Sequence, residues 1–180
     1  YVAFIALFTF LFFLSKSALS PTFQLTNSPT ILTKGHYGET FIVEISYSHE
    51  GLEQWLTQLP KPYPLILADV NWLTRSEEIM KLLIEKQIPV GLLGQESEQY
   101  KNPSLLTQEL KQFQHIFGQM PLWFATKDDL VDTALMQTLF QKQINVLSPA
   151  NTYPAIPTKG DFIALRLHRH TAVDFQDVTN

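Results

Sequence analysis

A strand-helix-strand pattern between Pro64 and Gly94 is the feature of this sequence that most constrains its fold. The segment begins with the apolar run Leu65–Ala68, continues with a helical pattern from about residue 76 to 86, and ends with a second apolar run over 88–93. This length and this order are typical of a βαβ unit. The pattern therefore predicts two parallel strands joined by a crossover helix.

The same rhythm repeats along the rest of the chain. Strands are expected over 40–47, 121–124, 144–147 and 161–168, and helices over 48–59, 103–117 and 128–143. The repetition predicts an α/β fold with a mostly parallel sheet, and both an open doubly wound sheet and an incomplete barrel fit it. Glu44 lies among apolar residues, and we expect it on a solvated strand face. Asp128 and Asp129 are interpreted as helix-start carboxylates.

The first residues form an almost unbroken apolar run, from Tyr1 to Leu14. Its length suits the core of a signal peptide, and a retained membrane anchor or a buried core helix are the alternatives. We therefore expect an N-terminal apolar helix over 1–19 as signal peptide or anchor, a linker and turn over 20–38, and the α/β domain over 39–180. This organisation predicts a protein that is secreted or held on the extracellular face of the cell membrane.

Composition excludes one class of partner. With 45% hydrophobic and 17% charged residues the chain can bury a substantial core. Its net charge of −4 argues against nucleic acid, which requires a basic surface. The absence of cysteine fits an exported protein without disulfides, and it fits many cytosolic proteins equally well.

Asp69 ends the first strand of the βαβ unit, where ligands of parallel sheets gather. From this strand onward, the order of segments resembles the polysaccharide deacetylases with a NodB homology domain. The resemblance rests on five segments in order: 65–69, 76–83, 88–94, 110–124 and 160–168. It implies an irregular or incomplete β/α barrel of the NodB type, with mostly parallel strands. In that family such a barrel acts on acetylated sugars of chitin or peptidoglycan.

The residues that carry the family's chemistry are mostly replaced. The family holds a divalent metal with one Asp and two His, uses a second Asp as general base, and lowers the pKa of a metal-bound water. Asp69 matches the base, but Val70 and Asn102 stand where two metal ligands are expected. Ala125 stands where an Arg orients the base, and His168 matches the general acid. The resemblance therefore implies a degenerate site with Asp69 and His168 as vestigial catalytic residues and no metal.

Two functions remain open from the sequence. In the first, the domain is a non-catalytic module that binds cell-wall glycan or a partner protein at the cell surface. The aromatic residues Trp72, Tyr100 and Trp123 are its candidate carbohydrate contacts. In the second, the protein is an active metal-dependent carbohydrate N-deacetylase with Zn²⁺ or Mn²⁺ held by a rebuilt set, Asp69, His168 and His170.

Overall fold

The computed structural model describes residues 25–36, 38–156, 158–169 and 173–178. The expected signal peptide or anchor over 1–19 and the candidate ligand His170 lie outside these residues. Within the described ranges, none of the helices combines the length and the apolar character needed to cross a membrane.

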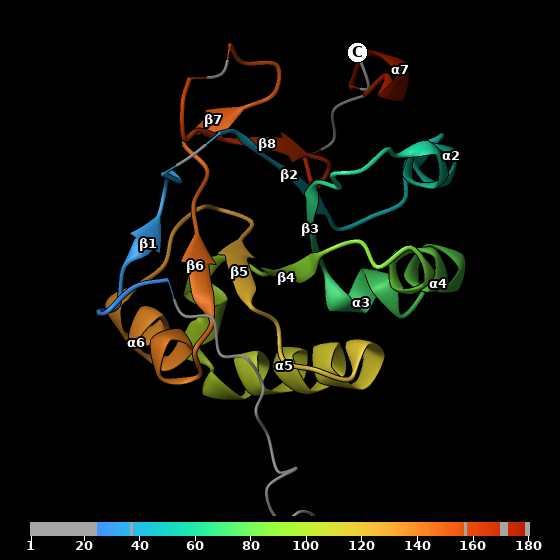
Figure 1. Ribbon diagram of the computed structural model, residues 1–180. Helices are drawn as coiled ribbons and strands as arrows, with labels where there is room; N and C mark the ends of the chain where they lie inside the picture. The colour runs from blue at the N-terminus through green and yellow to red at the C-terminus, as the bar shows by residue number, and fades with distance from the viewer. Residues whose placement is uncertain (1–24, 37, 157, 170–172, 179–180) are drawn as a thin grey trace, which may run out of the picture.

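One eight-stranded sheet forms the centre of the fold, and it curls into part of a barrel (Figure 1). Its strand order is β1-β6-β5-β4-β3-β2-β8-β7, and every neighbouring pair is parallel. The strands are β1 (Ile31–Leu32), β2 (Thr40–Ile45), β3 (Leu65–Ala68), β4 (Val90–Gly94), β5 (Trp123–Thr126), β6 (Asn145–Leu147), β7 (Asn151–Thr152) and β8 (Phe162–Arg166). The predicted incomplete barrel of parallel strands is confirmed.

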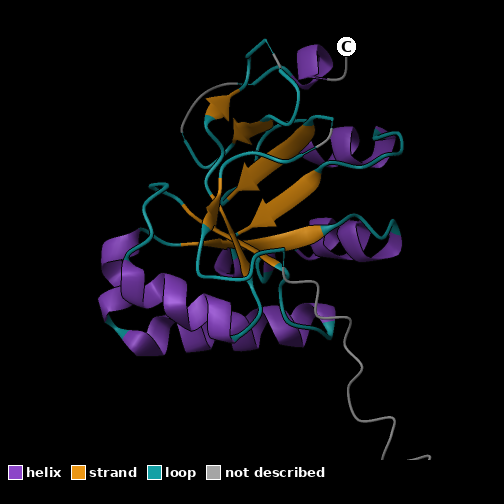
Figure 2. Cartoon of the chain, turned by 60° about the vertical axis from the view of Figure 1, so that its left-hand side comes forward, coloured by secondary structure: helices purple, strands orange, loops and turns teal. Residues whose placement is uncertain are grey.

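Helices cover the outside of the curled sheet (Figure 2). They are α2 (Leu52–Gln58), the single turn α3 (Val70–Leu73), α4 (Glu77–Glu85), α5 (Pro103–Phe117), α6 (Thr133–Gln141) and α7 (Phe175–Val178), with a 3-10 turn η1 (Ser97–Lys101) before α5. Helix α5 begins with Pro103 after the N-cap Asn102 and ends at Gly118 in the left-handed conformation. The predicted helix over 103–117 is therefore confirmed at both ends.

The strands are apolar on both faces because both faces are covered. Side chains on the inner face, among them Ile42, Leu67 and Leu93, pack with one another in a cluster made only of strand residues. Their neighbours in sequence, such as Val43 and Ile66, pack outward beneath the helices. Alternation along each strand thus separates a barrel interior from a helix-facing core.

Two local predictions change. Helix α6 begins at Thr133 and not at Asp128, because the side chain of Asp132 caps it by accepting the N–H of Leu135 at 2.7 Å. The segment 20–38, expected to be a linker and turn, contributes β1, which pairs with β6 at the edge of the sheet. The apolar side chains of Ile31 and Leu32 pack against the core and hold this short strand at the edge of the sheet.

Candidate functional site

A layer of polar side chains lies above the apolar interior, at the carboxyl ends of the central strands. The inward alternation continues past the last apolar residue of each strand, from Leu67 to Asp69 in β3 and from Leu93 to Gln95 in β4. In β5 it continues from Ala125 to Lys127. These polar side chains therefore converge at one mouth of the half-barrel.

Asp69 accepts four hydrogen bonds. Its Oδ1 accepts the N–H groups of Asn71 at 2.8 Å and Trp72 at 3.2 Å, and thereby caps α3. Its Oδ2 accepts from the Gln95 amide at 3.0 Å and the Lys127 ammonium at 2.6 Å. Burial alone would raise the pKa of Asp69, but the bonds from Lys127 and Gln95 outweigh it and hold that pKa below its ordinary value. The Asp69 carboxylate is therefore ionised, and both of its oxygens already accept hydrogen bonds from the protein.

Lys127 is the cation of this site. Its ammonium contacts Asp69 and also donates to the Gln95 side-chain oxygen at 2.7 Å, and its side chain is 22% exposed. The resemblance placed Ala125 where the family's base-orienting Arg is expected. Residues two apart share a strand face, and Lys127 supplies a cation to Asp69 from the same inner face of β5. Sequence reasoning missed Lys127, although the two-residue alternation was the signal that could have found it.

A buried carboxyl group extends the network behind Gln95. The side chain of Glu109, from α5, accepts the hydroxyl of Tyr100 at 2.6 Å and the Gln95 amide at 3.3 Å. Burial raises the pKa of Glu109 above its ordinary value. The Tyr100 oxygen in turn accepts the backbone N–H of Gln95 at 2.8 Å. Glu109 and Tyr100 together fix Gln95, and through it Asp69.

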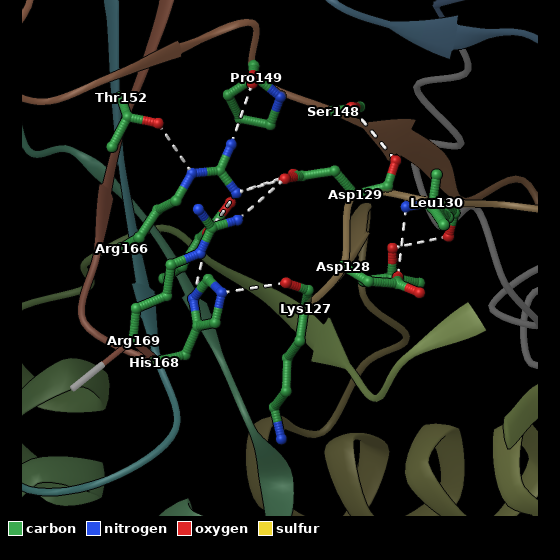
Figure 3. Close-up of polar contacts among 12 residues, drawn as sticks. Lys127, Asp128, Asp129, Leu130, Ser148, Pro149, Thr152, Arg166, His168 and Arg169 are labelled. Atoms are coloured by element: carbon green, nitrogen blue, oxygen red, sulfur yellow. Dashed lines mark hydrogen bonds and ion pairs between the residues drawn. The ribbon is translucent and has the colours of Figure 1, made fainter. Parts of the chain in front are cut away.

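A second cluster surrounds Arg166, the register partner of Glu44 across β2 and β8 (Figure 3). Its guanidinium contacts both carboxylate oxygens of Asp129, at 2.8 and 2.7 Å, and one oxygen of Glu44 at 3.3 Å. It also donates to the Thr152 hydroxyl and to the carbonyl of Pro149. The prediction of a solvated Glu44 is wrong: its inward position on β2 buries it completely, with Arg166 as its cation.

His168 connects the two clusters. Its Nε2 lies 3.1 Å from the backbone carbonyl of Lys127, which can only accept, so Nε2 carries the hydrogen. The other ring nitrogen faces Glu44 Oε2 at 3.2 Å without the alignment of a hydrogen bond. Burial raises the pKa of Glu44 to about 7 and lowers the pKa of His168 to about 4. The pair therefore consists of a neutral imidazole and a carboxyl group that titrates near neutrality.

The structure thus places Asp69 and His168 at the same end of the sheet, joined through the side chain and the backbone carbonyl of Lys127. The three aromatic candidates are not gathered there as open rings. Trp72 is 3% exposed and donates its indole N–H to Ser48 at 3.1 Å, and Tyr100 is 8% exposed. Trp123 is the first residue of β5 and therefore lies at the amino end of the strands, whereas Asp69 lies at their carboxyl end. A stacking platform needs an accessible ring face, so Trp72 and Trp123 do not line the polar mouth, and Tyr100 contributes only its hydroxyl, through Glu109 and Gln95.

The residues present do not fit the divalent metal of the deacetylases. Asp69 has its oxygens committed to four donors, Val70 is apolar and fully buried, and Asn102 accepts the N–H of Ser104 to cap α5. Across the part of the chain that the structure describes, no three or more His, Cys, Asp or Glu side chains form a group that could hold a metal ion. The chemistry of this site is therefore that of a hydrogen-bonded ion-pair network.

Comparison with known proteins bears on the fold. No protein-family model and no curated protein matches the chain. Solved structures do match the chain. One is a family 4 carbohydrate esterase (CE4) pseudoenzyme from Bacillus anthracis, which matches with a TM-score of 0.61 and 12% sequence identity, over 78% of this chain and 59% of that chain. The carbohydrate esterase PdaA from Bacillus subtilis matches with a TM-score of 0.66 and 7% sequence identity, over 84% of this chain and 76% of that chain. The chain spans about 60% of the length of the pseudoenzyme structures it matches.

Proposed function

From a fold shared with the family 4 carbohydrate esterases, we propose that this chain is a catalytically silent domain of the deacetylase type. It binds cell-wall glycan through the polar mouth of the half-barrel, and it acts as an exported protein, secreted or anchored at the outer face of the cell membrane. In this proposal the chain keeps a fold like that of the polysaccharide deacetylases, but an ion-pair network takes the place of their metal site.

The ion pair between Lys127 and Asp69 is the observation that carries the proposal. A general base must be able to take a proton from water, and it works best with a pKa near the operating pH. Asp69 instead has a lowered pKa and accepts four hydrogen bonds. The donors for a water-activating metal are replaced as well. Hydrolysis of an acetamide thus lacks both its base and its activated water.

The same mouth retains groups that suit a sugar. Lys127 and Asp129 are partly accessible, with side chains 22% and 24% exposed, and Arg169 is 51% exposed beside Asp129. Ammonium, guanidinium and carboxylate groups at such positions can donate to and accept from sugar hydroxyls and acetamido oxygens. Solved structures of the same fold include the peptidoglycan deacetylase PdaC from Bacillus subtilis, with TM-score 0.62 and 9% identity, over 84% of this chain and 83% of that chain. Oligomers of N-acetylglucosamine are therefore the ligand class we propose.

Calorimetric titration of the protein with N-acetylglucosamine oligomers tests the proposal. We expect saturable binding without acetate release, and loss of binding in Lys127→Met, which removes the ammonium group that faces Asp69. Lys142→Met is the matched control, because Lys142 is an exposed lysine at the end of α6, at the other end of the fold from the site. Undiminished binding of the oligomers by Lys127→Met would contradict the proposal that the polar mouth is the glycan-binding site.

The alternative is an active metal-dependent carbohydrate N-deacetylase. It requires stoichiometric Zn²⁺ or Mn²⁺ in protein purified without chelator, and acetate release that is lost in Asp69→Asn. Metal analysis and acetate measurement on the same preparation separate the two functions. Bound metal together with acetate release would overturn the proposal of a silent domain.

A further inference from the structure

The carboxylate of Asp129 lies between two guanidinium groups at the polar mouth (Figure 3). Nη1 of Arg166 donates to both of its oxygens, at 2.8 and 2.7 Å, and Nη2 of Arg169 donates to Oδ2 at 3.3 Å. A guanidinium group matches a carboxylate in both shape and charge. Arg166 and Arg169, called the arginine pair below, therefore form a place that holds a carboxylate, and a side chain of the chain itself supplies it.

The arginine pair is fixed on its inner side and accessible on its outer side. The side chain of Arg166 is 5% exposed, and its guanidinium donates to the Thr152 hydroxyl and to the Pro149 carbonyl, each at 3.1 Å. The side chains of Arg169 and Asp129 are 51% and 24% exposed. A carboxylate that arrives from solvent can thus reach the position of Asp129 and meet a guanidinium that is already oriented.

The charges around the arginine pair favour an anion. Lys127 is paired with Asp69, so Asp129 is the carboxylate that both guanidinium groups share. Glu44 also faces Arg166, at 3.3 Å, but burial raises the pKa of Glu44 to about 7, so its carboxyl group is mostly protonated in mildly acidic solution. Two cations then share one negative charge, although the net charge of the whole chain is −4. The surplus positive charge of the mouth is therefore concentrated at the arginine pair.

We propose that the arginine pair is a subsite for the carboxylate of an acidic sugar, and that Asp129 occupies this subsite until the sugar arrives. The inference rests on the proposed function, which makes the mouth a glycan-binding site, and it adds the charge of the glycan. Asp129 belongs to the loop over 127–132, between β5 and α6. Rotation about its Cα–Cβ bond turns its carboxylate toward solvent, and the ligand carboxylate takes over the contacts with the arginine pair. No covalent bond changes.

Calorimetric titration with two tetrasaccharides tests this subsite. The acidic probe is the hyaluronan tetrasaccharide, in which N-acetylglucosamine alternates with glucuronate, and the neutral probe is the N-acetylglucosamine tetramer. Asp129→Asn opens the subsite and keeps the backbone, because Asn tolerates the φ of 60° found at this position. A site that is closed in most molecules binds more weakly in proportion. At a pH of about 5.5 we expect Asp129→Asn to bind the acidic probe at least about tenfold more tightly than the unsubstituted protein does.

Asp128→Asn is the matched control for this gain. It removes the same charge one residue earlier, where the carboxylate accepts the N–H groups of Ser97 and Leu130 and not those of the arginine pair. The affinity for the acidic probe should stay that of the unsubstituted protein. Addition of Arg169→Gln to Asp129→Asn should abolish the gain, and the exposed position of Arg169 makes this change compatible with folding. If Asp129→Asn does not fold, Arg169→Gln alone should weaken binding of the acidic probe.

The two probes separate this inference from the proposed function. Equal affinity of Asp129→Asn and the unsubstituted protein for the acidic probe would overturn the carboxylate subsite, and so would a gain that persists without Arg169. Binding of the neutral probe in that case would leave the proposed function standing. A gain for the acidic probe without any binding of the neutral one would support the subsite and contradict the proposed ligand class. Failure of both probes to bind would overturn both proposals.

Discussion

The ring nitrogen Nδ1 of His168 lies 3.2 Å from Oε2 of the fully buried Glu44, while Nε2 of the same ring donates to the Lys127 carbonyl. Because Nε2 keeps its hydrogen, a second proton in this pair belongs either to Nδ1 or to the Glu44 carboxyl group. Burial raises the pKa of Glu44 to about 7 and lowers the pKa of His168 to about 4. Between these values the proton resides on Glu44.

Unfolding moves this proton from Glu44 to His168. Glu44 has an ordinary pKa of 4.5 and a folded pKa of about 7, so its contribution to stability is lost as pH rises through this interval. His168 has an ordinary pKa of 6.5 and a folded pKa of about 4, so its contribution is gained as pH rises from 4 to 6.5. The two slopes oppose each other between pH 4.5 and 6.5. We expect the intact pair to add almost no pH dependence there.

Single substitutions should expose the two slopes separately. In His168→Gln the Glu44 slope remains, and the free energy of unfolding should fall by about 1.4 kcal/mol per pH unit from pH 5 to 6.5. In Glu44→Gln it should rise by a similar amount over the same range. Urea unfolding of both variants and of the unsubstituted protein measures this directly. Curves that stay parallel to that of the unsubstituted protein would contradict the shared proton.

Removal of the Lys127 cation should destabilise the domain. Lys127→Met leaves the 5% exposed Asp69 carboxylate without its ion-pair partner, and such losses cost about 1–3 kcal/mol for a partly accessible cation. The pKa of Asp69, followed by carbon NMR of its carboxyl group, should rise toward its ordinary value. The control Lys81→Met breaks an exposed pair with Glu77 on α4 and should cost under about 0.5 kcal/mol. Equal costs for the two variants would show that the buried pair contributes no more than a surface pair.

Asp129 should control the protonation of Glu44 through Arg166. Asp129→Asn removes the closest carboxylate partner of Arg166 and leaves Glu44 as the carboxylate facing that guanidinium. Arg166 lowers the pKa of Glu44 and Asp129 raises it. The pKa of Glu44 should therefore fall below 7 in the variant, as measured by NMR titration. Asp128→Asn, one residue earlier and bonded to Ser97 and Leu130, is the control and should leave that pKa unchanged.

The Tyr100 hydroxyl should stabilise the fold as part of the Gln95 network. Tyr100→Phe leaves Oε2 of the 1% exposed Glu109 and the backbone N–H of Gln95 without their hydrogen-bond partner, and this should cost about 1–3 kcal/mol in urea unfolding. Tyr63→Phe is the matched control, because the Tyr63 ring lies against the ammonium groups of Lys61 and Lys86, a contact that phenylalanine keeps. An unchanged free energy of unfolding in Tyr100→Phe would mean that water replaces the hydroxyl.

The sequence predicted the parts of the fold that depend on local patterns. The strand-helix rhythm placed the parallel strands, and α5 was bounded by Asn102-Pro103 and Gly118. Asp69 and His168 could be assigned to one end of the sheet because both follow strands. The start of α6 was misplaced, since Asp128 and Asp129 look like capping residues until Asp132 is seen to accept the N–H of Leu135.

The composition of the site depended on contacts between distant strands. Glu44 and Arg166 are 122 residues apart and pair only because β2 lies beside β8. A charged residue within a strand is ordinarily solvated, and only an identified partner reverses that interpretation. Gln95 and Lys127 were missed for the same reason: each follows its strand by one residue on the inner face, and their meeting with Asp69 requires the strand order to be known.

The positive charge beside Asp69 is carried by the polypeptide itself. A metal ion at such a carboxylate would exchange with the medium, and its occupancy would follow supply, competing chelators and pH. Lys127 is covalently part of the chain, so a chelator cannot remove it from the site. The glycan binding that we propose for this mouth should therefore be unaffected by metal starvation or by EDTA. The domain would then keep its binding activity under conditions that inactivate metal-dependent enzymes.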